Sequence, residues 1–347
     1  MTSYAIVVYV ACAGSNEILS FRLDSSKGTL EQVGVASVPG PNGPSPSNLP
    51  LAFSPRKDML YAALRSEPFS VASFSVDPVS GALTYRSTAP LPAPMAYIST
   101  NRQGNLLLGA SYVQGKLSVS RITSGVVEGA AVQVVTTPPK AHCVIAGTSG
   151  NAIYVPTVTG NAIMVYHLDA ETGIPSPADP PSMVFHPGSG PRHATFHPTL
   201  DVLYCVNETA GSLTAVGVQP SVGALTALQY KALMPAGYQG NARAADVHVT
   251  PDGSFVYASV RTTHQIHGFK IAAPSGKLSP IGSFEVEGSP RSFAIDPSGR
   301  FLICGGQDEN TLATYRIDPD GALALQHRIP VGPNPSWVET LAISVRS

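Results

Sequence analysis

The apolar residues of this chain fall in short runs bounded by turn-forming residues, and the runs repeat. One unit recurs: a strand ending near proline, a tight turn, a strand with Tyr or Leu, a polar gap, a third strand and a G-x-L turn. The clearest copies are AFSPRKDMLYAALR from Ala52, TFHPTLDVLYCVNE from Thr195, HVTPDGSFVYASVR from His248 and AIDPSGRFLICGGQ from Ala294; weaker copies start at Ile98 and Ile145. Such repeats are typical of arrays in which each unit buries its apolar face against its neighbours.

The repeat period and the two chain ends together predict a closed ring. The turn residues Leu30, Leu83, Ile174, Leu225, Leu278 and Leu323 lie roughly 45 to 53 residues apart where neighbouring units can be compared, which suits four short strands per unit. Six units are complete. The seventh is split between YVACAGSNEILSFRLDSSKGTL, from Tyr9, and NPSWVETLAIS near the C-terminus, whose NPSWVE matches SPRSFA from Ser289. The prediction is an all-β, seven-bladed β-propeller of four-stranded blades. Residues 1–347 form one domain, and a C-terminal strand joins the N-terminal blade to close the ring.

Composition narrows the possible partners and the compartment. The chain has 347 residues, a net charge of -1 and 12% charged residues, which argues against nucleic acid or an anionic membrane as the partner. No run reaches the ~18 apolar residues of a membrane helix. The start, MTSYAIVVYVACAGS, lacks a basic segment and alternates like a strand, so we expect a strand rather than a signal peptide. The spacing of Cys12, Cys143, Cys205 and Cys304 fits no zinc pattern, so small buried side chains in a reducing compartment are expected. We predict a cytoplasmic monomer.

Two equivalent positions of the repeat carry polar residues that the scaffold does not require. The first, at the start of the inner strand, is held by Leu49, Ala96, His142, Arg192, Ala245 and Arg291. The second, at the end of the next strand, is held by Arg65, Tyr112, Val158, Glu208, Arg261 and Gln307. The two strands are antiparallel neighbours, so both positions should face the same mouth of the central channel.

The concentration of these side chains favours a functional site over solvated strand ends. The polar members lie mainly in the fourth to sixth units of a chain that is poor in charge. The neighbouring first-strand residues His193, Arg243, Asp246 and His248 are expected to join them. Arginines beside a carboxylate in one funnel suit an anionic or polyhydroxy ligand held by forked hydrogen bonds.

Sharper motifs have ordinary interpretations here. In HATFH, His193 and His197 would share a metal on a helix, but on a strand they lie ~13 Å apart. His197 precedes a turn proline and is expected to be a turn residue, while His264 and His267 in HQIH are expected at the surface or in blade packing. The chain has no G-x-S-x-G motif and no GxxxxGK[ST] phosphate loop. We therefore predict no metal and no other cofactor.

Several phrases resemble those of a known family. GPRHATFHPTLDVLYCVNE, ADVHVTPDGSFVYASVR and GSPRSFAIDPSGRFLICGGQ are similar to phrases of the seven-bladed lactonase family, which includes bacterial 6-phosphogluconolactonases. The fungal carboxymuconate lactonising enzyme shares its architecture, and the resemblance covers nearly the whole chain. It implies a catalytic group matching His142, Arg192, Glu208 and Arg261. The chain departs from many relatives at Val260, where they have asparagine, and in GASYVQGKLSVS, which is short of polar side chains; both departures bear on the substrate.

The resemblance and the repeat together predict a metal-independent hydrolase that opens a sugar lactone, of the gluconolactone, 6-phosphogluconolactone or aldaric-acid type. Either Glu208 or His142 would be the general base, and Arg192 and Arg261 would stabilise the oxyanion. The expected substrate-binding residues are His193, Arg243, Asp246, His248, Arg291, Gln307, Arg65 and Tyr112. The partner would be a small-molecule lactone or sugar acid. Two alternatives stay open: a muconate-type lactonising cycloisomerase and a non-catalytic propeller that binds a ligand or protein.

Overall fold

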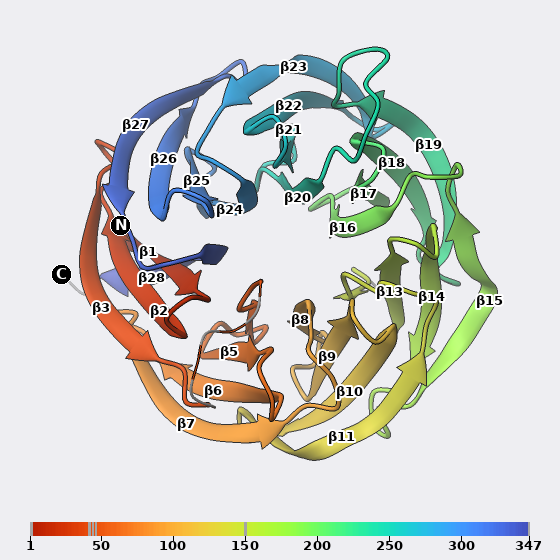
Figure 1. The fold of residues 1–347 in the computed structure, drawn as a ribbon, viewed down its shortest axis with the longest axis horizontal. Helices are drawn as coiled ribbons and strands as arrows, with labels where there is room; N and C mark the ends of the chain where they lie inside the picture. Colours follow the sequence, from red (N-terminus) through yellow and green to blue (C-terminus); the bar gives the residue numbers. More distant parts are fainter. Residues whose placement is uncertain (1–2, 41–42, 44, 46, 149–150, 346–347) are drawn as a thin grey trace.

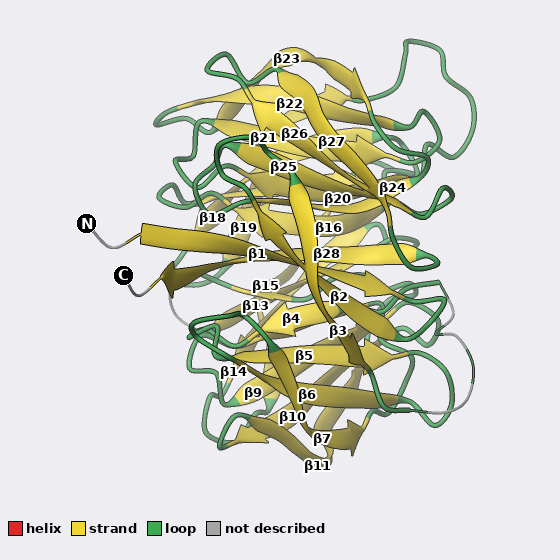
Figure 2. Cartoon of the chain, turned by 90° about the vertical axis from the view of Figure 1, so that its left-hand side faces the viewer, coloured by secondary structure: helices red, strands yellow, loops and turns green. Residues whose placement is uncertain are grey.

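The protein is a ring of four-stranded antiparallel sheets. The computed structural model describes residues 3–40, 43, 45, 47–148 and 151–345. Within these ranges, all the regular secondary structure is β-strand. Seven sheets surround a central channel, with their loops gathered at the two faces of the ring (Figures 1 and 2). The sequence-based prediction of an all-β, seven-bladed propeller is confirmed.

The blades are numbered along the chain, and in each the innermost strand is named first. Blades 1 to 3 are β4 (Leu51–Phe53), β5 (Met59–Leu64), β6 (Ser70–Val76), β7 (Leu83–Pro90); β8 (Tyr97–Thr100), β9 (Leu106–Ser111), β10 (Lys116–Thr123), β11 (Val126–Thr136); and β12 (Ile145–Ala146), β13 (Ala152–Thr157), β14 (Ala162–Leu168), β15 (Pro175–Val184). Blades 4 to 6 are β16 (Pro191–Phe196), β17 (Val202–Asn207), β18 (Ser212–Gln219), β19 (Ala224–Ala232); β20 (Ala244–Val249), β21 (Phe255–Val260), β22 (Gln265–Ala272), β23 (Lys277–Glu285); and β24 (Pro290–Ile295), β25 (Phe301–Gly306), β26 (Thr311–Ile317), β27 (Leu323–Pro330). Blade 7 is β28 (Pro335–Val345), β1 (Ser3–Cys12), β2 (Glu17–Leu23) and β3 (Leu30–Ser37).

Blade 7 joins the two ends of the chain. β28 is its innermost strand and pairs with β1 in an antiparallel register that includes Val8↔Thr340 and Val10↔Val338. The N-terminal apolar run is therefore a strand, and the C-terminal strand supplies the missing first strand of the split unit, as predicted. This pairing leaves each terminal strand held by a partner from the other end of the chain.

Apolar layers between adjacent blades hold the ring together. The second strands β5, β9, β17 and β21 are buried along their whole length, because both faces of each blade pack on neighbouring blades. One such layer combines Tyr204 of blade 4 with Val247 and Val256 of blade 5. All four cysteines are buried and free. In the described part of the chain, no helix is long and apolar enough to cross a membrane.

Tyrosines of the second strands also clamp one blade to the next. Their hydroxyls donate to glycine carbonyls of the following blade in four places: Tyr9 to Gly81 (2.7 Å), Tyr61 to Gly125 (2.9 Å), Tyr204 to Gly276 (2.9 Å) and Tyr257 to Gly321 (2.8 Å). These four glycines have positive φ, between 66° and 88°. The clamp explains why the repeat pairs a tyrosine in its second strand with a glycine in a later turn.

Replacing Gly276 by alanine is expected to destabilise the ring by about 2–5 kcal/mol. Its φ of +66° strains a side chain by ~1–3 kcal/mol, and the new Cβ would lie 2.7 Å from Cγ2 of Val202. The matched control is Gly237→Ala, where φ is +79° but no atom lies within 4 Å, so only the backbone strain of ~1–3 kcal/mol applies. Urea unfolding of both variants measures the difference. Equal losses would contradict the packing explanation.

Candidate active site

β-bulges shape the channel mouth at the start of three inner strands. In blade 4, Pro191 pairs with Asn207 and His193 with Val206, so Arg192 is the extra residue. Blade 6 repeats this irregularity at Arg291, between the pairs Pro290↔Gly306 and Ser292↔Gly305. Blade 5 has its register shift between Ala244 and Val247. A bulge bends the strand and redirects side chains that strict alternation would send to opposite faces.

These strand ends enclose one cleft, and it brings together half of the predicted residues. The cleft has a volume of about 170 Å³. Its lining consists of Ser47, Arg65, Ala96, Tyr112, His142, Glu208, Arg261 and Arg291. Arg65, Tyr112, Glu208 and Arg261 directly follow β5, β9, β17 and β21, while His142 precedes β12 and Arg291 is in β24. The prediction that both repeat positions meet at one end of the blades is confirmed for these six residues.

Glu208 lies between two arginines. Oε1 accepts a hydrogen bond from Nη2 of Arg261 at 3.1 Å, and Oε2 lies 3.2 Å from Nε of Arg192. Both atoms of the second contact are buried and have no hydrogen-bond partner, so this contact is an ion pair whose geometry does not make a hydrogen bond. Burial alone would raise the pKa of Glu208, but Arg192, Arg261 and Arg291 together lower it. Glu208 is therefore a carboxylate at neutral pH.

The arginines differ in how they are held. Arg192 is fully buried behind Glu208 and donates to the carbonyl of Ala245, and Nε of Arg261 donates to the carbonyl of Arg243 at 2.9 Å. Arg65 donates to Oδ1 of Asn48 at 2.5 Å. Arg291 makes no hydrogen bond or ion pair with any residue that the structure describes. Burial lowers the pKa of Arg65 and of Arg261 to about 10, so both stay cationic at neutral pH.

His142 is a neutral imidazole in the wall of the cleft. Its side chain is buried, Nδ1 has no hydrogen-bond partner, and its ring contacts those of Tyr112 (5.3 Å between centroids) and His193 (5.0 Å). Burial, followed by the charges of Arg192, His193 and Arg291, holds the pKa of His142 well below its usual range. The basic form therefore predominates at neutral pH.

A polar and aromatic layer, buried except for the partly exposed His248 and Tyr97, lies below the cleft. Nδ1 of His193 is 2.9 Å from Oδ1 of Asp246, whose Oδ2 is 3.3 Å from Nε2 of His248. The rings of Tyr97 and Trp337 pack against His193, with centroids 5.1 and 6.0 Å away. None of these residues is among those that line the cleft. Each lies on an inner strand one to three residues after the first repeat position, which is Ala96, Arg192, Ala245 or Ser336 in these blades.

Comparison with known proteins places this site in a family. The family model described as lactonase, 7-bladed beta-propeller, matches residues 3–340. The chain belongs to the seven-bladed β-propeller lactonase family. The lactonase is 35% identical over 333 residues to the 6-phosphogluconolactonase of Yersinia pestis (strain Pestoides F), covering 95% of this chain and 96% of that one. The same identity and share of this chain hold for the 6-phosphogluconolactonase of Enterobacter sp. (strain 638), of which 97% is covered.

Solved structures resemble the lactonase over its whole length. The periplasmic gluconolactonase of Pseudomonas aeruginosa superposes with a TM-score of 0.89 and 26% identity, covering 99% of both chains. A putative 6-phosphogluconolactonase from Bacteroides uniformis superposes with a TM-score of 0.86 and 25% identity, covering 97% of this chain and 99% of that one. The family match and these relatives establish that the protein is an enzyme of the lactonase class.

Two predicted binding residues of the lactonase lie beside the cleft rather than in its lining. The side chain of Arg243 is exposed, and only its carbonyl takes part, as the acceptor for Arg261. Gln307 donates to the carbonyl of Ser47 at 3.0 Å and to Asn334 at 2.6 Å, so it anchors a loop that lines the cleft. Their depth and direction depend on the loops, which the repeat alignment does not describe.

The structure also adds residues that sequence reasoning missed. Tyr97 and Trp337 occupy the repeat position that follows the first one, the position held by His193 in blade 4. Comparing the residue that directly follows the first repeat position across the blades would have predicted the layer below the cleft. Ser47 lies outside the repeat and carries no such pattern.

The other predicted histidines of the lactonase have structural positions. His197 lies in a turn, where its Nδ1 accepts the N–H of Leu200 at 2.9 Å. Nδ1 of His264 accepts the N–H of Ser289 at 2.9 Å, and His267 is a largely buried residue of β22. Over the described ranges, no three His, Cys, Asp or Glu side chains form a group that could hold a metal ion.

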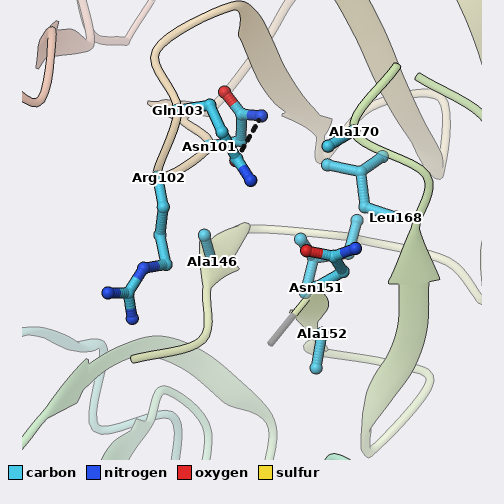
Figure 3. A pocket seen from close by; sticks show the side chains of 9 residues that line it. Asn101, Arg102, Gln103, Ala146, Asn151, Ala152, Leu168 and Ala170 are labelled. Atoms are coloured by element: carbon cyan, nitrogen blue, oxygen red, sulfur yellow. Dashed lines mark hydrogen bonds between the residues drawn. The ribbon is translucent and has the colours of Figure 1, made fainter. Parts of the chain in front are cut away.

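A smaller hollow between blades 2 and 3 lacks the charge of the cleft. It has a volume of about 10 Å³ and is lined by Asn101, Arg102, Gln103, Ala146, Asn151, Ala152, Ile153, Leu168 and Ala170. The amide of Asn101 donates to Gln103 at 3.0 Å, and Arg102 extends away from both (Figure 3). The described residues there offer no cluster of charges, so the cleft lined by Glu208 and three arginines is the stronger candidate.

Proposed function

We propose that the lactonase hydrolyses a phosphorylated sugar lactone, 6-phosphogluconolactone, without a metal, in the cleft at the mouth of its channel. The observation that carries the proposal is the charge of this cleft. Three arginines line it against one glutamate, and Arg192 adds a fourth guanidinium behind that glutamate. Such an excess of fixed positive charge suits a phosphate-bearing substrate better than a neutral one. The 35% identity to proteins named 6-phosphogluconolactonase supports the same choice.

The arginines divide into two roles under this proposal. Arg291 has no partner within the described chain and lies beside Arg65, so these two bind the phosphate. Arg261 is fixed by Glu208 and by a backbone carbonyl, which suits a group that must be in place before charge develops. Arg261 therefore stabilises the oxyanion that forms at the lactone carbonyl. Arg192, held behind Glu208, keeps that carboxylate in place.

His142 is the general base rather than Glu208. Both oxygens of Glu208 contact arginines, which favours the ionised form and weakens it as a proton acceptor. His142 is uncharged and lines the cleft, so it is ready to accept a proton. Arg291, one of the two arginines whose charges lower the pKa of His142, is also one of the two that a bound phosphate would neutralise. Substrate binding thus raises the basicity of His142 as it delivers the lactone.

The reaction then follows in two steps. His142 removes a proton from water, the hydroxide oxygen bonds to the lactone carbonyl carbon, and the carbonyl electron pair becomes an oxyanion near Arg261. When the tetrahedral intermediate collapses, the bond from this carbon to the ring oxygen breaks. The leaving alkoxide takes the proton from His142 and becomes a hydroxyl group, which yields the open-chain sugar acid and restores the base.

A substrate panel tests the proposal. Purified enzyme is assayed at neutral pH on 6-phosphogluconolactone, gluconolactone, an aldaric-acid lactone and a muconolactone, with spontaneous hydrolysis subtracted. We expect kcat/KM for the phosphorylated lactone to exceed that for gluconolactone by at least ~100-fold, since a charged hydrogen-bonded contact contributes about 1.5–3 kcal/mol. EDTA should leave the rate unchanged. A preference for the neutral lactone, or loss of activity on chelation with recovery by a divalent ion, would overturn the proposal.

The compartment and assembly stay proposals as well. Four free buried cysteines support a reducing compartment, and we retain the cytoplasm, although the relative from Pseudomonas aeruginosa is named periplasmic. We also retain the monomer predicted from the sequence. A small-molecule lactone or its sugar acid is the proposed partner.

A further inference from the structure

Two unpaired imidazole nitrogens lie on neighbouring rings, one in the wall of the cleft and one in the layer below it. Nδ1 of His142 and Nε2 of His193 are both buried and have no hydrogen-bond partner, while the centroids of the two rings lie 5.0 Å apart. An unpaired polar atom in a closed interior is costly, and such atoms are rare unless they have a role. His142 lines the cleft, whereas His193 does not.

Asp246 determines which nitrogen of His193 carries the proton. Its carboxylate can only accept a hydrogen bond. In the 2.9 Å contact between Nδ1 of His193 and Oδ1 of Asp246, Nδ1 must therefore carry the proton and donate it. Asp246 is itself fixed by the backbone N–H groups of Val247 (3.0 Å) and Phe293 (3.3 Å). Burial, followed by the charge of Arg192, lowers the pKa of His193 to about 4, so the ring is neutral near pH 7. Nε2 of His193 therefore bears a lone pair.

We propose that Asp246 and His193 are positioning residues for His142, resting on the function proposed above for His142. The lone pair at Nε2 of His193 accepts the Nδ1–H of His142 after a small rotation about χ2, a torsion that is soft in histidine. This hydrogen bond leaves the second nitrogen of His142 as the basic atom. When that atom takes the proton from water, the positive charge is shared along a chain that ends at the Asp246 carboxylate. The arrangement of aspartate, histidine and base follows the logic by which a fixed acceptor sets a catalytic tautomer.

The surroundings of His142 leave few competing partners. Its other charged or titratable neighbours are Arg192 on β16, Arg291 on β24 and Tyr112 after β9. Both arginines can only donate. His248 contacts the other oxygen of Asp246 at 3.3 Å. Among these groups, the hydroxyl of Tyr112 and Nε2 of His193 can accept. Nε2 of His193 is the buried acceptor without a partner, so it matches the unpaired Nδ1 of His142.

Nitrogen NMR of the wild-type enzyme tests the tautomers directly. Side-chain ¹⁵N spectra near pH 7, with signals assigned by their loss in His142→Gln and His193→Gln, should show a protonated Nδ1 and a bare Nε2 on both rings. A protonated Nε2 on either ring would overturn the inference. This measurement does not depend on activity. If His142→Gln kept the full rate of the wild type, the proposal that His142 is the general base would be wrong, whichever tautomers the spectra showed.

Kinetics supply the second test. Asp246→Asn and His193→Gln are each expected to lower kcat by about 10–100-fold, the range typical of partners that orient a reactive ligand, with KM changed less than about 2-fold. In Asp246→Asn the acid limb of the kcat/KM profile should move to lower pH, because protonated His142 loses the carboxylate that shares its charge. The control is His267→Gln on β22, also largely buried with an unpaired Nε2 but outside the channel, which should leave kcat unchanged. Because Asp246→Asn also disturbs two backbone contacts, His193→Gln decides the outcome if that variant fails to fold. Wild-type kcat in folded His193→Gln would overturn the inference.

Discussion

Replacing His142 by glutamine is expected to lower kcat by about 10²–10⁴-fold, the contribution of a general base. The imidazole lines the cleft, is uncharged at neutral pH and is the neighbour of Glu208 best able to accept a proton from water. Glutamine keeps most of the volume and a polar end but cannot take the proton. The free energy of unfolding should change little, because Nδ1 of His142 makes no hydrogen bond that the variant would lose. The initial rate of acid release, corrected for spontaneous hydrolysis, measures kcat.

The comparison with Glu208→Gln separates base from scaffold. Removing this carboxylate leaves Arg192 without its 3.2 Å ion-pair partner in a fully buried place. Breaking such a pair typically costs ~3–5 kcal/mol, so this variant should lose stability as well as activity. Urea unfolding measures that loss. If His142→Gln kept its rate while a fully folded Glu208→Gln lost it, Glu208 would be the base.

Replacing Arg291 by glutamine should lower kcat/KM for the phosphorylated lactone by about 100-fold and for gluconolactone by less than about 3-fold. Arg291 lines the cleft and has no partner in the described chain, so the variant removes a charge-assisted contact to phosphate without breaking an internal one. Arg291 also contributes to the lowered pKa of His142. The acid limb of kcat/KM for the neutral lactone should therefore move to higher pH. Full pH profiles on both substrates measure the two effects.

The matched control for Arg291 is Arg300. Its guanidinium lies over the ring of Phe301 at 5.6 Å, outside the cleft, so Arg300→Gln should leave both substrates unaffected. Equal losses on the phosphorylated and neutral lactones in Arg291→Gln would contradict a phosphate role. They would assign Arg291 to the reaction itself or to the shape of the cleft.

The fold could be predicted because its determinants are local and repeated. Each blade needs an alternation of apolar residues, a turn after proline and a glycine with positive φ, and these recur with a regular spacing. The split seventh unit also followed from pattern, since NPSWVE matches a first strand. The meeting of Arg65, Glu208 and Arg261 in one cleft followed from their shared repeat position, and antiparallel pairing added His142 and Arg291.

The sequence by itself thus determined the ring, its closure and the mouth at which the polar residues gather. Only the tertiary structure decided how deep each residue lies and which charges pair. His193 and Asp246 were expected to bind substrate, yet they lie below the cleft and contact each other from strands of different blades, 53 residues apart. The bulges at Arg192 and Arg291 likewise depend on cross-strand register. Pattern reports which face of a strand a residue occupies, whereas burial, pairing and pKa depend on the neighbours that other blades bring to it.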